Sequence, residues 1–432
     1  MSKDILSRRT FLKVLGGGLL LAGGGWLFSK RSWWTKAGQA VLGQGNGEGM
    51  EAGCLRQVIT SSSATSRTVM WQSMVEQPEA VIEYGLHEGE QMFTARAESE
   101  LFRDDGVEMF LHNVRLSNLE PGRKYRYRLT NGQESTAWHT LQTDAGTPFK
   151  ALIFPDSQSN DYSDWQDIAQ GAWQRNPDSS FFINMGDIVD NGEDHKQWQD
   201  WFAAVAGMIE DIPVAPLMGN HETYDQQWKV RWPEAYLHHF VLPDNKSRDF
   251  AGQYYSFDYG PVHFIMLNTQ WDELNEFKPG LVEEQLAWLR ADAARSNRRW
   301  KIALLHKDVL QYGLHKRPER QEGFSEAGQL FMPVLEELGV DVVLTAHLHT
   351  YRNRGHIRDF RRDPLGPLYI LTGVAGNVRY PGIWKDHALD ERIAPQPETN
   401  NYLTLEADDA HLRLQCFLPD GSAIDDVSVE KA

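Results

Sequence analysis

The sequence predicts a mixed α+β and α/β protein, with an antiparallel β-sandwich followed by a larger α/β domain. The first observation is length, because 432 residues exceed what a single hydrophobic core usually organises. The second is a change of pattern near residue 149, where short β-rich runs give way to apolar runs that alternate with longer polar stretches. With 41% hydrophobic and 24% charged residues, the composition is that of a globular protein.

Short β-rich runs separated by turns predict the sandwich. The runs are residues 68–72, 80–84, 112–116 and 125–129. Regular turns between short strands favour two packed antiparallel sheets. The turn Leu119-Glu120-Pro121-Gly122, followed by Tyr125-Arg126-Tyr127, resembles fibronectin type III domains and the domain that precedes the catalytic unit of purple acid phosphatases. We expect this domain to span residues 50–146.

Seven apolar runs predict the strands of the second domain. They are residues 151–154, 181–185, 214–218, 262–267, 302–305, 340–345 and 368–371. Runs that are apolar throughout are typical of strands that helices cover on both faces. Residues 283–294 form a clear helix candidate between two of these runs.

Most of these runs end at a side chain that is able to bind a metal ion. The candidate ligands are Asp156, Gln158, Asp187, Asn220, His306, His347 and His349. The carboxyl ends of parallel strands meet in one crevice, so we expect these side chains to converge. Each of them alone has a simpler explanation, since an Asp after a strand is often a helix cap and a lone buried His is often a core residue. The prediction rests on their ordered coincidence.

The ordered motifs resemble the calcineurin-like metallophosphoesterase superfamily. They are Asp156-Ser157-Gln158, Gly186-Asp187-Ile188-Val189-Asp190, Gly219-Asn220-His221-Glu222, His306 and His347-Leu348-His349. The resemblance implies a four-layer α/β/β/α metallophosphoesterase domain, which we place at residues 149–420. It also implies a hydrolase that acts on phosphoric ester bonds with two divalent metal ions, Fe, Mn or Zn.

The resemblance further implies a role for each motif residue. Asp156 and His349 hold the first metal, Asp187 bridges both metals, and Asn220, His306 and His347 hold the second. A metal-bound hydroxide attacks phosphorus in a monoester or diester. His221 protonates the leaving oxygen or stabilises the transition state.

Three residues depart from the family pattern. Gln158 replaces a His and is either a weak oxygen ligand or the partner of a water. Ala346 replaces a Gly, which the chain tolerates if the backbone there is not at positive φ. Asp190 stands where purple acid phosphatases carry Tyr, so we expect no purple chromophore and assign Asp190 to orienting His221.

Two arginines, Arg352 and Arg354, follow the last motif. They are either substrate contacts or part of a solvated basic loop. The two cysteines, Cys54 and Cys416, are compatible with one disulfide or with two separate thiols.

The first 40 residues resemble a twin-arginine signal peptide. Ser7-Arg8-Arg9-Thr10-Phe11-Leu12-Lys13 precedes a glycine-interrupted apolar run over residues 14–28, and Ala40 offers a cleavage site. We therefore expect recognition by the twin-arginine export machinery and a periplasmic or extracytoplasmic location in a bacterium. A membrane anchor, if the signal is uncleaved, and a basic N-terminal helix with no export role are the alternatives.

Net charge sets limits on the partners. A formal charge of −17 disfavours a general nucleic-acid binder, which needs a basic face. A phosphorylated small molecule or a cell-envelope substrate is the expected partner, since bound metals supply local positive charge. The alternative function is a catalytically decayed extracytoplasmic binding or adhesion protein, and Gln158 is the feature that favours it.

Overall fold

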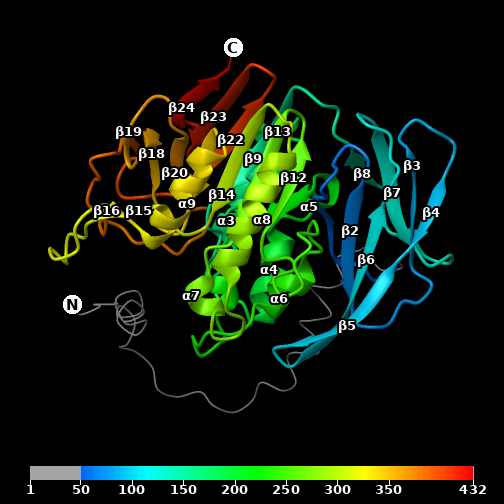
Figure 1. Ribbon diagram of the computed structural model, residues 1–432. Helices are drawn as coiled ribbons and strands as arrows, with labels where there is room; N and C mark the ends of the chain where they lie inside the picture. Colours follow the sequence, from blue (N-terminus) through cyan, green and yellow to red (C-terminus); the bar gives the residue numbers. More distant parts are fainter. Residues whose placement is uncertain (1–49, 432) are drawn as a thin grey trace. The chain divides into compact units, whose positions relative to one another are not determined.

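The computed structural model describes residues 50–431, so the predicted signal of residues 1–40 lies outside the described residues. Residues 50–431 form a β-sandwich followed by an α/β domain with two central sheets (Figure 1), which confirms the predicted fold class. In this part of the chain no helix is both long enough and apolar enough to cross a membrane.

The sandwich consists of two antiparallel four-stranded layers. One layer has the order β1-β2-β6-β5 and the other β4-β3-β7-β8. The bounds are β1 Gly53–Val58, β2 Arg67–Ser73, β3 Val81–Leu86, β4 Phe93–Arg96, β5 Glu98–Asp104, β6 Val107–Leu116, β7 Lys124–Thr130 and β8 His139–Gln142. Alternate residues face the space between the layers, where Trp71, Ile82 and Tyr127 are fully buried.

The α/β domain is built on two sheets. The part of the first sheet that lies in this domain has the strand order β24-β23-β22-β9-β10-β11. The second sheet has the order β12-β13-β14-β17-β20-β18-β19. The bounds in the first are β9 Phe149–Phe154, β10 Phe181–Asn184, β11 Val214–Pro216, β22 Tyr402–Ala407, β23 His411–Phe417 and β24 Ala423–Glu430. The bounds in the second are β12 Tyr255–Tyr259, β13 Val262–Leu267, β14 Trp300–Leu305, β17 Val342–Thr345, β18 Tyr351–Arg358, β19 Arg361–Arg362 and β20 Leu368–Thr372, with β21 Arg392–Ile393 on β18. A separate short hairpin pairs β15 Leu310–Gln311 with β16 Gly323–Phe324.

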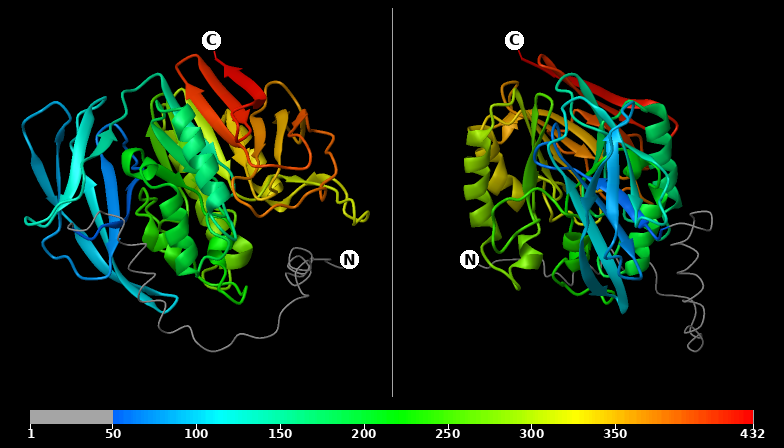
Figure 2. Two further views of the ribbon diagram at one scale, coloured as in Figure 1. Left: turned by 180° about the vertical axis from the view of Figure 1, so that it is seen from behind. Right: turned by 90° about the vertical axis from the view of Figure 1, so that its right-hand side faces the viewer.

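Helices cover the outer faces of both sheets, and short helical turns such as η1 lie in the loops between strands. They are α3 Ser163–Arg175, α4 His195–Ala204, α5 Met208–Asp211, η1 His221–Thr223, α6 Glu234–His239, α7 Trp271–Leu274, α8 Leu281–Arg295 and α9 Glu326–Glu337. Helices α8 and α9 lie on the face shown in Figure 1, and α3 and α4 lie on the opposite face (Figure 2). Because successive strand residues point to opposite sides, Ile153 and Ile302 pack between the sheets while Leu152 and Leu305 pack under helices.

The sandwich and the α/β domain share one continuous sheet. Val58 of β1 pairs in parallel with Val214 of β11, and the Ile59 amide donates to the Val214 carbonyl at 3.0 Å. The first strand of the sandwich is thereby joined to the α/β sheet through backbone hydrogen bonds, not only through loops.

A buried histidine near the amino end of β13, away from the predicted ligands, ties this strand to helix α8. His263 donates through Nδ1 to Asp258 at 2.7 Å and through Nε2 to Asp292 at 3.0 Å, while Arg298 and Arg295 bond the same carboxylates. Burial alone would lower the pKa of His263, but the two carboxylates raise it to about 9.

His263 should therefore stabilise the fold in a pH-dependent way. A histidine whose pKa is higher in the folded state stabilises fully below its unfolded pKa, and this stability is lost as pH rises through the folded pKa, here about 9. The contribution is on the order of 3 kcal/mol. Chemical denaturation at a series of pH values should show the wild-type free energy of unfolding falling, relative to His263→Gln, between about pH 6.5 and pH 9. Parallel curves for the two proteins would contradict this, and the exposed His411→Gln serves as the control.

Candidate metal centre

The predicted ligands converge at the carboxyl ends of five strands. They are Asp156 and Gln158 after β9, Asp187 after β10, Asn220 after β11, His306 after β14, and His347 and His349 after β17. Strands β9, β10 and β11 belong to one sheet and β14 and β17 to the other, so both sheets supply donors. All of these side chains are buried except the half-buried His347.

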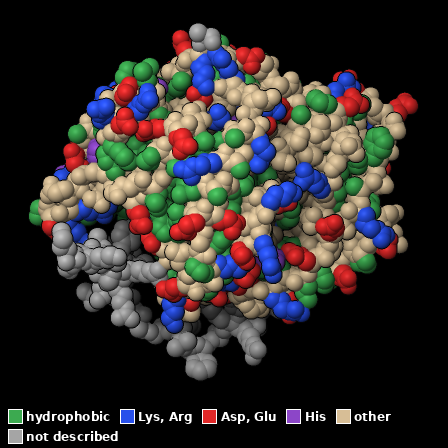
Figure 3. Space-filling model, in the orientation of Figure 1, with side chains coloured by type: hydrophobic (Ala, Val, Ile, Leu, Met, Phe, Trp, Pro, Cys, Tyr) green, Lys and Arg blue, Asp and Glu red, His purple; other side chains and the backbone are tan. Residues whose placement is uncertain are grey.

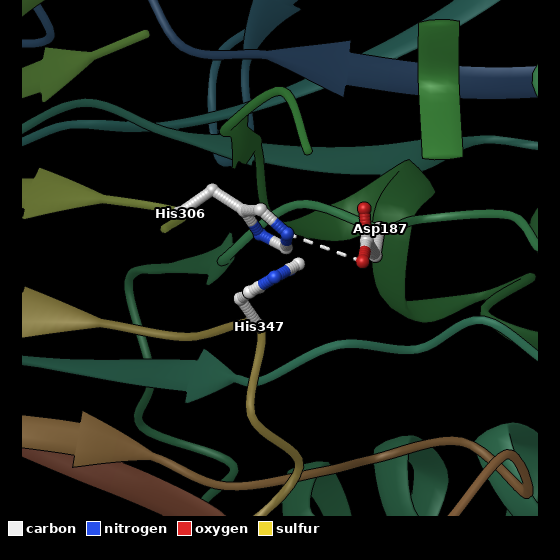
Figure 4. A group of neighbouring side chains, drawn as sticks. All are labelled: Asp187, His306 and His347. Atoms are coloured by element: carbon white, nitrogen blue, oxygen red, sulfur yellow. Dashed lines mark ion pairs between the residues drawn. The ribbon is translucent and has the colours of Figure 1, made fainter. Parts of the chain in front are cut away.

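Two groups of ligands share one carboxylate. Asp187, His306 and His347 form the first group, and Asp156, Asp187 and His349 form the second, with the donor atoms of each group within 4.8 Å of one another. Figure 4 shows the Asp187 carboxylate facing the His306 and His347 rings. A carboxylate common to two adjacent groups has the position of a bridging ligand between two ions.

In the group around Asp156, an imidazole and an amide stand beside the carboxylate. His349 Nε2 lies 3.2 Å from Asp156 Oδ2 and 3.2 Å from Gln158 Nε2. The Gln158 oxygen Oε1 is buried and accepts no hydrogen bond. The opposite orientation of the same amide would direct this oxygen into the cluster. Gln158 therefore fits a weak oxygen ligand.

Backbone carbonyls orient two of the imidazoles, one in each group. His306 donates through Nδ1 to the Met185 carbonyl at 2.9 Å, and its Nε2 lies 3.1 Å from Asp187 Oδ2 and 3.3 Å from Asn220 Oδ1. His349 is held the same way, through Nδ1 and the Val378 carbonyl at 2.6 Å. An outer hydrogen bond of this kind fixes the tautomer and points Nε2 at a metal.

Close packing at the strand ends explains the glycines of the motifs. Gly186 has φ +94°, and a Cβ there would lie 2.7 Å from the Gly219 nitrogen and from His306 Nδ1. A Cβ at Gly219 would lie 2.1 Å from Asp187 Oδ1. Three ligands, Asp187, His347 and His349, themselves have positive φ. Non-glycine residues adopt this conformation at a cost that is typical of functional sites.

Ala346 does not adopt positive φ, so its methyl group is tolerated where the family pattern has Gly. The conformation at positive φ belongs instead to the neighbouring His347, at 74°.

Glu222 holds the strand-end loops together. Its carboxylate accepts hydrogen bonds from the backbone amides of Asp187 at 3.1 Å, Ile188 at 2.8 Å and Gly219 at 2.7 Å. The Glu of the Gly-Asn-His-Glu motif thus positions the Asp187 loop rather than facing the ligand groups.

The electrostatics of the cluster favour a cation. Burial alone would raise the pKa of Asp187, but His306 and His221 hold it well below its usual range. Burial alone would lower the pKa of His306, but Asp187 and Asp156 raise it to about 9. The buried carboxylates of Asp187 and Asp156 thus concentrate negative charge beside His306, where a metal ion would supply positive charge. The donor set fits two divalent ions.

His221 lies at the edge of the cluster. Its backbone amide donates to Asp187 Oδ1 at 2.9 Å, and its ring Nε2 lies 3.9 Å from Asp187 Oδ2. Nδ1 donates to the backbone carbonyl of Asp190 at 2.7 Å, whereas the Asp190 carboxylate lies 3.6 Å away. The residue expected to orient His221 therefore does so mainly through its main chain, which any residue type would provide.

Arg352 and Arg354 were wrongly predicted as substrate contacts. Both are buried, at 2% and 0% exposure. Arg352 pairs with Asp390 at 2.6 Å and Arg354 with Asp308 at 2.5 Å. The physical reason is that each guanidinium is buried and its charge is neutralised by a buried carboxylate. Neither group faces solvent, so both stabilise the fold. The solvated-loop alternative is wrong for the same reason.

Three aromatic residues near the cluster were not predicted. The Tyr380 ring lies 4.8 Å from that of His349, and the rings of Tyr224 and Trp228 lie 5.8 and 5.7 Å from that of His221. All three are on loops, where no strand-end pattern points to them. The two cysteines are free thiols, Cys54 bonding Gln199 and Cys416 bonding Asn401.

Carboxylate, amide and imidazole donors at the strand ends of a four-layer α/β/β/α domain define the class of binuclear metallophosphoesterases. Residues 139–351 match the calcineurin-like phosphoesterase family, and residues 55–143 match the N-terminal domain of purple acid phosphatases. The chain carries both domains, and it is a phosphoric ester hydrolase with a binuclear metal centre.

Curated relatives include acid phosphatases of plants and animals. Purple acid phosphatase 23 of Arabidopsis thaliana is 25% identical over 68% of this chain and 70% of its own length. Acid phosphatase type 7 of Danio rerio is 27% identical over 72% of this chain and 75% of its own length. Purple acid phosphatase 15 of Arabidopsis thaliana is 31% identical, and the match covers 47% of this chain and 36% of that relative.

Solved structures share the fold. The purple acid phosphatase PPD1 from yellow lupin seeds superposes with a TM-score of 0.70 at 18% identity, covering 89% of this chain and 74% of that one. A structure of PhoD superposes with a TM-score of 0.61 at 13% identity, covering 87% and 90%.

Proposed function

We propose that the chain is an exported phosphatase that hydrolyses phosphomonoesters or phosphodiesters in a bacterial periplasm or another extracytoplasmic space. The observation that carries the proposal is the Asp187 carboxylate, which two ligand groups share within 4.8 Å. Such a centre is the one that places two ions on the same phosphoryl group.

The residue roles follow from the two groups. Asp156, Gln158 and His349 would hold the first metal, Asp187 would bridge both metals, and Asn220, His306 and His347 would hold the second. When bound, the two ions polarise the phosphoryl oxygens and lower the pKa of a water molecule. Hydrolysis then joins a water oxygen to phosphorus, breaks the bond to the leaving group and delivers a proton to the leaving oxygen.

His221 is the residue of this chain that supplies that proton. The Asp190 carbonyl occupies its Nδ1, which leaves Nε2 directed at the cluster, 3.9 Å from the shared Asp187 oxygen. An imidazolium whose Nδ1–H is held by that carbonyl presents its Nε2–H to the phosphoryl position and is suited to donate to the leaving oxygen.

A small substrate suits the surface. Acidic and basic side chains are interspersed over the face of the described residues in Figure 3, and no continuous basic track crosses that face. With a net charge of −17, this favours a phosphorylated small molecule or a cell-envelope ester over a long nucleic acid.

Hydrolysis of p-nitrophenyl phosphate and bis(p-nitrophenyl) phosphate tests the activity. The mature protein is assayed after chelation and after addition of Mn, Fe or Zn, and bound metal is counted in parallel. We expect turnover only with metal, at about two ions per chain, and the ratio of the two rates gives the ester class. Failure to bind any metal, together with no turnover, would favour the decayed binding protein instead.

Export is tested separately with the full chain. Residues 1–40 should carry the folded protein out of the cytoplasm through the twin-arginine machinery. Fractionation of cells that express the full chain should recover it in the periplasm or medium. Recovery only in the cytoplasm would reject export and leave the hydrolase proposal intact.

Gln158 weakens the first metal site, so Gln158→His should strengthen it. An imidazole is a better ligand than an amide for Zn and Fe, and His349 Nε2 lies 3.2 Å from Gln158 Nε2 and 3.2 Å from Asp156 Oδ2. We expect about tenfold slower loss of one metal to a chelator. Gln166→His, at an exposed position on helix α3, is the control and should not change the rate. Equal metal loss from wild type and Gln158→His would mean that Gln158 does not contribute a ligand.

A further inference from the structure

We propose that Trp228 is a stacking platform for the leaving group, and that the enzyme therefore prefers phosphate esters whose leaving group carries a planar aromatic ring. The inference rests on the proposed function and deepens it, since it names a substrate class for the same centre. Aryl phosphates and nucleoside phosphates share this chemistry.

Trp228 and Tyr224 form an aromatic wall beside His221. The ring centroid of Trp228 lies 5.7 Å from that of His221 and 6.0 Å from that of Tyr224, and both rings stand nearly perpendicular to His221, at 88° and 90°. His221 is the group assigned to the leaving oxygen. The leaving group therefore emerges from the centre next to this wall.

The indole is held out of the core. Trp228 is 42% exposed, although the protein buries most of its large aromatic side chains. Its backbone has φ +60°, and its amide donates to the Asp225 carbonyl at 2.8 Å. A bulky residue rarely adopts positive φ unless its surroundings impose it, and such positions cluster at ligand sites. The loop thus presents an indole to solvent in a defined orientation.

The loop of residues 224–231 is rigidly supported. The side chain of Asp225 accepts from the backbone amides of Gln227 at 2.9 Å and Lys229 at 2.8 Å. At its base, the Arg231 amide donates to the Thr223 carbonyl at 2.8 Å. Pre-organisation of this kind lowers the entropy lost when a ligand binds.

The β-sandwich contributes to that support. Asp104, at the end of β5, accepts two hydrogen bonds from Arg231, at 2.9 and 3.1 Å. Asp105 accepts from Gln226 at 2.7 Å. The β5–β6 hairpin of the sandwich therefore braces the loop that carries Trp228, which gives this domain a role at the centre without placing it in the chemistry. Asp104 is a positioning residue.

The chemistry of the wall selects a planar ring. An exposed indole face next to a polar centre gains from stacking with another π-system, and a base on an aromatic side chain gains about tenfold or more in affinity. A sugar or an alkyl chain lacks this face. Four esters assayed as substrates of the metal-loaded protein separate these cases. They form two pairs: adenosine 5′-monophosphate with ribose 5-phosphate, and phenyl phosphate with cyclohexyl phosphate.

In the first pair the planar base is the main difference. In the second pair phenolate is also a better leaving group than cyclohexanolate, so only the change in preference that Trp228→Ala produces reports on the ring. We expect kcat/KM of the wild type to favour the planar member, with Trp228→Ala reducing that preference about tenfold and Trp228→Phe retaining most of it. Whichever pair responds identifies the nucleoside or the aryl ester as the better fit. Trp138→Ala removes an indole of matching exposure, 41%, from the sandwich and should leave the preference unchanged.

The brace is tested in the same assay. Asp104→Ala should reduce the preference about threefold by loosening the loop, while Arg103→Ala, which breaks an exposed pair with Glu108 on the same hairpin, should not. An equal loss for planar and non-planar esters in Trp228→Ala would mean that Trp228 only supports His221. That result, or a wild type without preference for planar esters, would overturn the proposal.

Equilibrium binding separates this proposal from the hydrolase proposal. Phenylphosphonate and cyclohexylphosphonate have P–C bonds that resist hydrolysis, so calorimetric titration reports affinity without turnover. Tighter binding of the phenyl compound, lost in Trp228→Ala, would support the platform even if no ester were hydrolysed. Turnover of all four esters with equal binding of the two phosphonates would reject the platform and keep the hydrolase.

Discussion

Replacement of His221 by Ala is expected to lower kcat about 100- to 1,000-fold while both metal ions remain bound. A positioned general acid contributes on this scale. The ring is not a member of either ligand group; its Nε2 lies 3.9 Å from Asp187 Oδ2, and its backbone amide, which bonds Asp187 Oδ1 at 2.9 Å, survives the substitution. The geometry of the donors should therefore persist.

The leaving group discriminates between two roles of His221. A p-nitrophenolate ion leaves without a proton, whereas an alkoxide needs one. If His221 donates the proton, the loss in His221→Ala is much smaller for p-nitrophenyl phosphate than for an alkyl phosphate. If it only stabilises negative charge on the phosphoryl oxygens, both esters lose equally. His238→Ala, which removes a half-exposed imidazole paired with Glu100 and Glu234, is the control. Unchanged kcat for the alkyl ester in His221→Ala would contradict both roles.

The strand ends were predictable because their signal is local. An apolar run of strand length followed at once by Asp, Asn or His identifies both the strand and its ligand, as at β14, where His306 follows Leu305. The predicted run 262–267 coincides with β13, and the predicted helix 283–294 lies within α8. The topology then brings the ligands together, because the strands of both sheets end at the same crevice.

The residues that were misjudged depend on distant partners. From the sequence, Arg352 and Arg354 resemble a basic loop. The carboxylates that pair with them, Asp390 and Asp308, lie 38 and 46 residues away in the chain. The joining of β1 to β11 depends on a contact between two domains, and no periodicity within either strand reveals it. Trp228 is conspicuous only once the fold has placed its loop beside His221.

Asp187, whose carboxylate both ligand groups share, is the position where a conservative substitution should lower metal binding and kcat most. Asp187→Asn keeps the size of the side chain, and an amide oxygen is still able to accept from the His221 amide at the position of Oδ1. It removes the negative charge that both ligand groups use. Because each metal stabilises the transition state by several kcal/mol, we expect loss of one or both ions and a fall in kcat of roughly 1,000-fold or more.

Two measurements decide whether the loss arises from the centre itself. Metal content per chain should fall below two in Asp187→Asn, and the rise in Tm that metal addition produces in the wild type should shrink, since a ligand that binds the folded state stabilises it in proportion to its affinity. The exposed Asp178→Asn is the matched control. If Asp187→Asn kept two ions and the full metal-induced rise in Tm, Asp187 would not be the bridge. The two ligand groups would then be independent sites, and a substrate phosphoryl group would have to be held by one ion at a time, which would remove the basis for assigning His221 to the leaving oxygen.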